Sequence, residues 1–235
     1  PEAYAIREGA SMQARVWIGL GLEAIIFAGL LFGSAGTLGW PPAWAFLGVF
    51  FVAAFLITRM LAHDPALLGS RMRWSIRRER LPWDGLFGVL LTVLFPGWFV
   101  LMGLDAVRFD WSWMPDWLQI IGGIGAATAM AVIYRVSEEN AFLSPIIRIQ
   151  RECGHRVIST GPYALVRHPL YAAGLVLLVS TALLLGSWFG LAGVGVLASA
   201  VVFRTAMEDR WLRIKREGYA DYARKVPYRL VPGVW

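Results

Sequence analysis

The stretch that decides the fold is Leu170–Phe203, LYAAGLVLLVSTALLLGSWFGLAGVGVLASAVVF, which carries no charged side chain. At 1.5 Å per residue it would form one helix about 51 Å long, whereas the hydrocarbon core of a bilayer is about 30 Å thick. Gly186 and Ser187 interrupt the apolar pattern near its middle, and Trp188 is of a type that prefers the membrane interface. The run therefore predicts a transmembrane helical hairpin that turns at Gly186-Ser187-Trp188.

The composition of the 235-residue chain is also that of a membrane protein. Hydrophobic residues make up 57% and charged residues only 16%, and the mean hydropathy is +0.57. A net charge of +6 would suggest nucleic acid as the partner of a soluble protein. Here the basic residues follow the loops between apolar stretches, so we expect the lipid bilayer as a partner and no nucleic acid.

Four further apolar stretches have the length that a membrane span requires: Val16–Gly33, Trp44–Leu61, Leu86–Leu104 and Trp117–Tyr134. Arg71–Arg80 contains five arginines, whereas Gly33–Ala43 contains none. Because basic loops stay in the cytoplasm, this pattern predicts six spans with both termini cytoplasmic. The expected fold is an all-α polytopic bundle forming one integral-membrane domain, residues 1–235. Residues 1–136 would hold four spans, and residues 137–235 the hairpin and a cytoplasmic tail.

Two weaker patterns have simple structural explanations. Gly123-Ile-Gly125-Ala-Ala-Thr128 resembles a dinucleotide-binding loop, but it lies inside an apolar span, where small residues allow helices to approach closely. Gly190, Gly193 and Gly195 invite the same explanation. The single cysteine, Cys153, and the three histidines, His63, His155 and His168, show no metal-ligand spacing, so no metal site is predicted.

Glu23 is the only acidic residue inside a predicted span. An ionisable side chain at that depth is costly and commonly functional. Two interpretations stand side by side. Glu23 either lines a substrate cavity or pairs structurally with an arginine such as Arg59.

The segment before the hairpin, Gly161-Pro-Tyr-Ala-Leu-Val-Arg-His-Pro-Leu-Tyr171, is the most informative part of the chain. Pro169 suits the first turn of a helix, where its missing N–H has no cost. Arg167 and His168 therefore precede a helix N-terminus, and the free N–H groups there attract a carboxylate or phosphate.

A second polar segment, Arg204–Tyr222, follows the hairpin. The hairpin returns the chain to the face that it left, so Arg204 and Glu208 should lie beside Arg167 and His168. Such a cluster predicts a pocket for a small charged cofactor with a flat ring. Ordinary alternating charge on a solvated helix is the competing explanation for residues 208–217, and we expect it to hold for Arg213, Lys215 and Arg216.

Together these residues resemble the integral-membrane methyltransferases, a superfamily that includes isoprenylcysteine carboxyl methyltransferases and phospholipid N-methyltransferases. The shared pattern is Gly-x-Tyr-x-x-x-Arg-His-Pro-x-Tyr before a hairpin, then an acidic turn and Gly-Tyr-x-x-Tyr. It covers Val157–Pro232, and the segment around Asn140 and the tail Val226–Trp235 are similar to the bacterial branch. The resemblance implies an integral protein of the bacterial inner membrane.

The resemblance further implies S-adenosylmethionine at the cytoplasmic face and a lipophilic or small acceptor that enters from the membrane. His168 and the helix start would hold the methionine carboxylate, and Glu208 the amino group or ribose. Two positions depart from the family pattern: Ala173 replaces a usual glycine, and Glu208-Asp209 replaces a usual Glu-Glu pair. The positions that match cofactor-binding residues of the family are Tyr163, Arg167, His168, Pro169, Tyr171, Glu208, Tyr219 and Tyr222.

Methyl transfer is an in-line displacement, so it needs alignment more than a strong acid or base. A carboxylate acceptor needs no base, whereas an amine or thiol must lose a proton, with Glu208, Glu139 or Glu23 as candidate acceptors of it. Arg204 and Glu208 are the predicted catalytic pair, with Arg204 orienting an anionic acceptor. Glu23, Asn140 and Arg204 are the predicted substrate-binding residues.

Two other function classes stay open from the sequence alone. One is an NADPH-dependent membrane reductase related to sterol reductases, which share a related carboxyl-terminal membrane fold. The other is a non-catalytic transporter or partner subunit. The oligomeric state is equally open.

Overall fold

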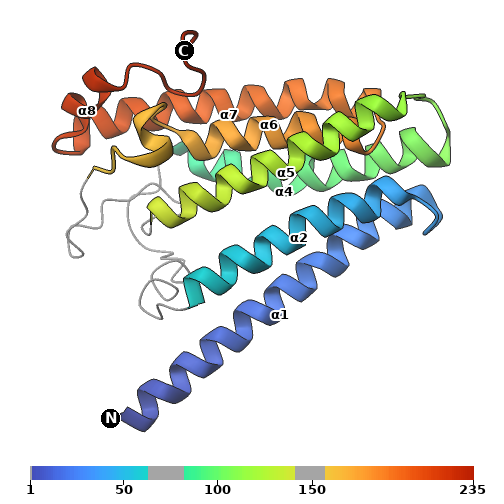
Figure 1. The fold of residues 1–235 in the computed structure, drawn as a ribbon, viewed down its shortest axis with the longest axis horizontal. Coiled ribbons are helices and arrows are strands. Elements are labelled where there is room, and N and C mark those ends of the chain that lie inside the picture. Colours follow the sequence, from blue (N-terminus) through green and yellow to red (C-terminus); the bar gives the residue numbers. More distant parts are fainter. Residues whose placement is uncertain (1, 63–81, 141–156) are drawn as a thin grey trace.

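The computed structural model describes residues 2–62, 82–140 and 157–235, and their regular structure is helical throughout (Figure 1). No strand occurs within these ranges, and the predicted all-α polytopic bundle is confirmed. A π-helical turn, η1 (Leu104–Arg108), and a 3-10 turn, η3 (Gly161–Ala164), supplement the longer helices. These are α1 (Glu2–Ala35), α2 (Pro41–Ala62), α4 (Pro82–Gly103), α5 (Asp116–Glu139), α6 (Pro169–Leu184), α7 (Trp188–Lys215) and α8 (Tyr219–Lys225).

Within the described ranges, four stretches of helix are long and apolar enough to cross a membrane. They are Gln13–Ala35, Pro41–Ala62, Asp116–Glu139 and Trp188–Lys215, which correspond to the first, second, fourth and sixth predicted spans. Helix α4 occupies the place of the third predicted span, and α6 that of the fifth. Helix α6 has only 16 residues, about 24 Å at 1.5 Å per residue, so it is shorter than the hydrocarbon core is thick.

The bundle has two chemically different ends (Figure 1). The short connections α1–α2, α4–α5 and α6–α7 lie together at what we call the hairpin end. Helix α8, the residues after it and the start of α6 lie at the opposite end, which we call the tail end. The basic loop Arg71–Arg80 and the residues His63, Cys153 and His155 lie outside the described ranges.

The predicted hairpin turn between α6 and α7 is confirmed. Gly186 adopts the left-handed conformation at φ 77°, which glycine tolerates without strain. The Ser187 side chain then caps α7 by accepting a hydrogen bond from the backbone N–H of Gly190. Trp188 is the first residue of α7.

Helix α7 differs from the sequence prediction in one respect. The apolar run ends at Phe203, but the helix continues without a break to Lys215. Strong helix formers such as Ala206, Met207 and Leu212 allow this continuation although the residues become polar. Arg204 and Glu208 therefore lie on the same rigid rod as the membrane-spanning turns.

Small residues bring α5 and α6 into close contact, as the sequence predicted for this span. A Cβ added to Gly122 would fall on the backbone of Leu184, and one added to Gly125 on the hydroxyl of Ser180. In α7, Gly190 and Gly193 approach Met102 and Trp98 of α4 in the same way. Gly195 is different, because a Cβ there would meet nothing within 4 Å.

A buried carboxyl group ties the hairpin end together. Asp105, in η1, is completely buried. Its Oδ2 accepts hydrogen bonds from the hydroxyls of Ser112 (2.7 Å) and Ser187 (2.5 Å) and from the Phe189 N–H (3.3 Å). These bonds fasten the α4–α5 connection to the start of α7.

Candidate cofactor pocket at the tail end

The Gly161–Tyr171 segment folds as a 3-10 turn followed by the start of α6. Gly161 has φ 56°, and an added Cβ would lie 3.1 Å from the Glu139 carboxyl group, so glycine suits this position on both counts. Pro169 is the first residue of α6, as predicted. Arg167 and His168 consequently lie directly before this helix.

Asp209 of α7 is the centre to which this segment is attached. Arg167 and Asp209 are both buried, and they form a bidentate pair, Nε to Oδ1 at 2.7 Å and Nη2 to Oδ2 at 3.2 Å. The remaining terminal nitrogen, Nη1, donates to the carbonyl oxygens of Val226 and Pro227, at 2.7 Å each. Arg167 thus uses its guanidinium group to hold three parts of the protein together.

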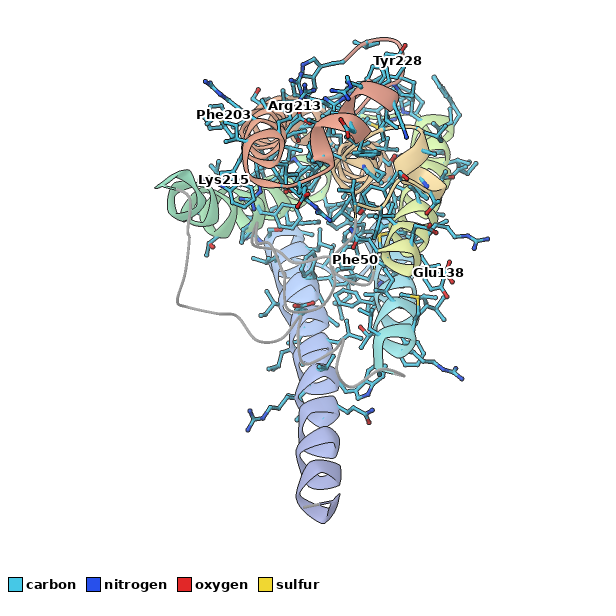
Figure 2. All side chains as sticks on the ribbon, turned by 90° about the vertical axis from the view of Figure 1, so that its left-hand side faces the viewer. Phe50, Glu138, Phe203, Arg213, Lys215 and Tyr228 are labelled. Carbon is cyan, nitrogen blue, oxygen red and sulfur yellow. The ribbon has the colours of Figure 1, made fainter. Side chains whose placement is uncertain are left out.

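The residues after α8 attach to the same centre. The backbone N–H groups of Arg167 and His168 donate to the carbonyls of Tyr228 and Arg229, each at 2.9 Å. The Arg229 Nε donates to Asp209 Oδ2 at 3.0 Å. The start of α6 is therefore clamped between α7 and the tail. Figure 2 views the molecule from this end, with Arg213 and Lys215 labelled on α7 and Tyr228 on the tail.

Two buried tyrosines of α8 complete the arrangement. The Tyr219 hydroxyl donates to Asp209 Oδ1 at 3.0 Å and lies 3.4 Å from His168 Nε2. The Tyr222 hydroxyl donates to the carbonyl of Tyr163 at 2.7 Å. Burial raises the pKa of both tyrosine hydroxyls, so both remain protonated donors at neutral pH.

A second hydrogen-bonded chain lies farther along α7, toward the apolar part of the bundle. Arg204 is buried, and its Nε donates to the Tyr171 hydroxyl at 3.0 Å. That hydroxyl donates in turn to Glu208 Oε2 at 2.8 Å. The predicted catalytic pair, Arg204 and Glu208, is thus connected through Tyr171.

These groups surround a pocket of about 690 Å³, counting the part that is open to solvent. The lining includes every predicted cofactor-binding residue and Asn140, whose side-chain amide donates to the Tyr163 hydroxyl at 2.8 Å. The predicted residues in the lining are Asn140, Tyr163, Arg167, His168, Pro169, Tyr171, Glu208, Tyr219 and Tyr222.

Two predicted site residues have a different place. Arg204 lies behind Tyr171, to which it donates its hydrogen bond, and is not part of the lining. Glu23 lies on an exposed face of α1, and the structure does not bring it to the pocket. Glu139, a candidate base, accepts a hydrogen bond from the Thr160 hydroxyl beside Gly161.

The sequence analysis missed Asp209 and misplaced Arg216. It treated Asp209 only as a departure from a family pattern, although Asp209 organises the site. Arg213 is exposed, as expected, and its Nε also donates to Asp209 Oδ2 at 3.1 Å. Arg216 was expected on the same solvated face, but it lines the pocket. A four-residue spacing from Arg204 through Glu208 and Leu212 leads to Arg216, and continuing the helix along that spacing would have found it.

Comparisons with known proteins agree with this arrangement. Residues 119–216, which contain the Gly161–Tyr171 segment and all of α7, match the family described as phospholipid methyltransferase. Over 165 residues the chain is 28% identical to the cobalt-zinc-cadmium resistance protein CzcN of Cupriavidus metallidurans, an alignment that covers 69% of this chain and 68% of that protein.

The structural comparison concerns nearly the whole chain. The solved structure of the eukaryotic intramembrane Ras methyltransferase ICMT (isoprenylcysteine carboxyl methyltransferase) matches with a TM-score of 0.52 at 15% identity. The match covers 99% of this chain and 84% of that one. At this identity the likeness establishes a shared fold.

Proposed function

We propose that the chain is an integral-membrane methyltransferase of the isoprenylcysteine carboxyl and phospholipid methyltransferase type, and that it transfers the methyl group of S-adenosylmethionine to a lipophilic or small acceptor. The observation that carries this proposal is the pocket at the start of α6. It combines four tyrosines, a histidine, an acidic residue and two arginines within one cleft.

The lining suits S-adenosylmethionine in its chemistry. Val157, Ile158, Leu170 and Leu212 provide apolar surface for a flat ring, while Glu208 and Arg216 provide one charge of each sign. Bound there, S-adenosylmethionine supplies a methyl group activated by a sulfonium. His168, Pro169 and the tyrosines then act by holding the ligand in one orientation, which is what an in-line displacement chiefly requires.

The position of the pocket favours an acceptor from the membrane. Since α6 is about 24 Å long and the hydrocarbon core is about 30 Å thick, a hairpin turn at one boundary of the core places the other end of α6, with Pro169 and Tyr171, inside the core and close to its opposite boundary. A lipophilic molecule can then reach Tyr171 and Glu208 without leaving its leaflet.

The acceptor chemistry decides what Arg204 and Glu208 do. For a carboxylate or another anionic acceptor, Arg204 orients the incoming oxygen through its positive charge. For an amine or thiol, one proton must leave, and Glu208 takes it directly or through the Tyr171 hydroxyl. Loss of turnover in R204Q with activity retained in E208Q indicates the first case, and the reverse pattern indicates the second.

Calorimetric titration of the detergent-purified protein with S-adenosylhomocysteine tests the proposal, with NADPH as the control. We expect micromolar binding of S-adenosylhomocysteine alone. His168→Ala and Glu208→Ala should each weaken this binding without lowering expression. Binding of NADPH alone would replace the proposal with a reductase, and wild-type affinity in both variants would overturn the assignment of the site.

We also propose that the protein resides in a bacterial inner membrane with both termini in the cytoplasm, since the basic segments lie on that side in the predicted topology. Cys153 is the only cysteine, so its removal gives a clean background. A single cysteine placed in the tail, for example by Lys225→Cys at the end of α8, should react with a membrane-impermeant thiol reagent only after the cells are opened. Labelling in intact spheroplasts would show that the tail lies on the periplasmic side and would contradict the proposed topology.

A further inference from the structure

The residues after α8 turn back along the bundle (Figure 1). We call residues 226–235, VPYRLVPGVW, the tail strap. Its one charged side chain, Arg229, is half-buried and donates to Asp209. Residues 213–225, directly before the strap, carry seven charged side chains. The chain therefore changes from a charged to an apolar character where the strap begins.

Hydrogen bonds fix the depth of the strap in the membrane. The carbonyl groups of Tyr228 and Arg229 accept from the N–H groups of Arg167 and His168, at 2.9 Å each. Those two donors directly precede Pro169, the first residue of α6. Because α6 is about 24 Å long and the hydrocarbon core about 30 Å thick, this end of α6 lies close to the boundary of the core. The strap lies at the same level.

Apolar side chains are exposed at that level. In the strap, Val234 is 78% exposed and Val231 49% exposed, and Tyr228 is exposed as well. Leu165, in the connection between η3 and α6, is 67% exposed. Lipid that covers such side chains removes their unfavourable contact with water. The exposed surface of the strap is therefore continuous with the apolar surface of the bundle.

The backbone of the strap also suits surroundings that are poor in water. The carbonyl of Trp235 accepts from three N–H groups, those of Arg229 (2.7 Å), Leu230 (3.0 Å) and Val231 (3.4 Å). The carbonyl of Val231 accepts from the N–H groups of Val234 (3.1 Å) and Trp235 (3.2 Å). Polar backbone groups that approach the hydrocarbon need partners within the protein, and these five N–H groups have them.

The strap connects this surface to the ion-pair centre of the site. The guanidinium carbon of Arg229 lies 4.7 Å from the centre of the Trp235 ring, in a cation–π contact. The Nε of Arg229 donates to Asp209 Oδ2 at 3.0 Å. Directly before the strap, Arg224 and Lys225 are exposed at the end of α8. Exposed cations beside an apolar surface complement the anionic headgroups of a membrane.

We propose that the tail strap binds the lipid bilayer at the boundary of its hydrocarbon core, and that this contact fastens the start of α6. Tyr228, Val231 and Val234 contact the lipid chains next to the headgroups, while Arg224 and Lys225 face the phosphates. The bilayer then acts on the pocket through the hydrogen bonds between the strap and the start of α6. This inference does not depend on methyl transfer, because it concerns a surface and not the ligand.

Fluorescence quenching tests the lipid contact on the full chain, in nanodiscs of phosphatidylcholine and phosphatidylglycerol. With Cys153 replaced by serine, Val234→Cys carries a nitrobenzoxadiazole label, and Ala220→Cys, at an exposed position of α8, is the matched control. The label at 234 should emit at shorter wavelength, lose intensity with lipids that carry a nitroxide high on the acyl chain, and resist iodide. The label at 220 should show the opposite pattern. Val231→Cys supplies a second reporter position.

Amide hydrogen exchange in the same nanodiscs tests whether the contact fastens α6. Val234→Asp places a charge at the boundary of the core and should speed the exchange of the Arg167 and His168 N–H groups. Val234→Ile keeps an apolar side chain there and should exchange as the wild type does.

Three results would overturn the inference. Equal quenching by iodide at positions 234 and 220 would place the strap in water. Protection of the label at 234 from both iodide and the lipid nitroxide would mean that protein covers the strap, as in a complex with a second copy of the chain. Unchanged exchange in Val234→Asp would show that the strap does not fasten the start of α6. The binding of S-adenosylhomocysteine enters none of these measurements, so they stand apart from the test of the proposed function.

Discussion

Two aspartates at opposite ends of α7 are completely buried, and their surroundings differ sharply. Asp209 is part of the tail end, and Asp105 contacts the first turn of α7 through Phe189. The two contact points on α7 are twenty residues apart, about 30 Å along the helix. A comparison of the two carboxyl groups separates the part of the molecule that forms a site from the part that only holds helices together.

Asp209 has a charged environment, and Asp105 a neutral one. Both oxygens of Asp209 are engaged, with Arg167, Arg213 and Arg229 within ion-pair distance. Asp105 accepts only from two hydroxyls and a backbone N–H. Its Oδ1 has no hydrogen-bond partner among the described residues.

The difference shows what each end requires. Three chain segments that are distant in sequence, the start of α6, α7 and the tail, meet at Asp209, and ion pairs fix their relative geometry. At the hairpin end, short connections already hold neighbouring helices together, so a few neutral hydrogen bonds and close packing suffice. The functional end is therefore the one whose order depends on charge.

Asp209→Asn should have the largest effect of the changes that test this comparison. It keeps the shape of the side chain but leaves the buried Arg167 guanidinium without its counter-ion. Breaking a buried ion pair in this way costs about 3–5 kcal/mol. We expect a strongly lowered thermal unfolding temperature and loss of S-adenosylhomocysteine binding. Normal values of both would show that Asp209 is not the organising centre.

Gly122→Ala should have an intermediate effect, by disturbing packing near the hairpin end. The new methyl group would fall on the backbone of Leu184, and overpacking of this kind costs about 1–3 kcal/mol. Gly174→Ala in α6 is the matched control, because a Cβ there meets nothing within 4 Å. Thermal unfolding should distinguish the two variants, and equal unfolding temperatures would contradict close α5–α6 packing.

Asp105→Asn should have the smallest effect. The amide oxygen can still accept from Ser112 and Ser187, and the group that it replaces has one oxygen without a partner. We expect a change in stability of no more than about 1 kcal/mol and unchanged affinity for S-adenosylhomocysteine. A loss of affinity would mean that the hairpin end also controls the pocket.

Local sequence signals predicted much of the fold and part of the site. The length of the apolar run predicted the hairpin, and its glycine and serine predicted the position of the turn. The proline predicted where α6 starts. Each of these signals acts on residues that are close together in the sequence. The hairpin also brings Glu208 near His168 for topological reasons alone. These features need no knowledge of how side chains are rotated around a helix.

The remaining features depend on that rotation. Asp209 is the neighbour of Glu208 in sequence, yet it points into the protein while Glu208 points into the pocket. Glu23 is exposed on α1, because its position around the helix axis turns it away from the other helices. Arg216 was expected on the solvated side of a helix over residues 208–217, because the sequence did not reveal which side of that helix faces the pocket.

The attachment of the tail to the start of α6 has a consequence for biosynthesis. The Arg167 side chain is hydrogen-bonded to the carbonyls of Val226 and Pro227, about 60 residues later in the chain. At ordinary elongation rates of about 5–20 residues per second, these partners leave the ribosome several seconds after the start of α6. The helices can thus insert before any ligand can bind, and a nascent chain that stops short of Val226 would reach the membrane without a working site.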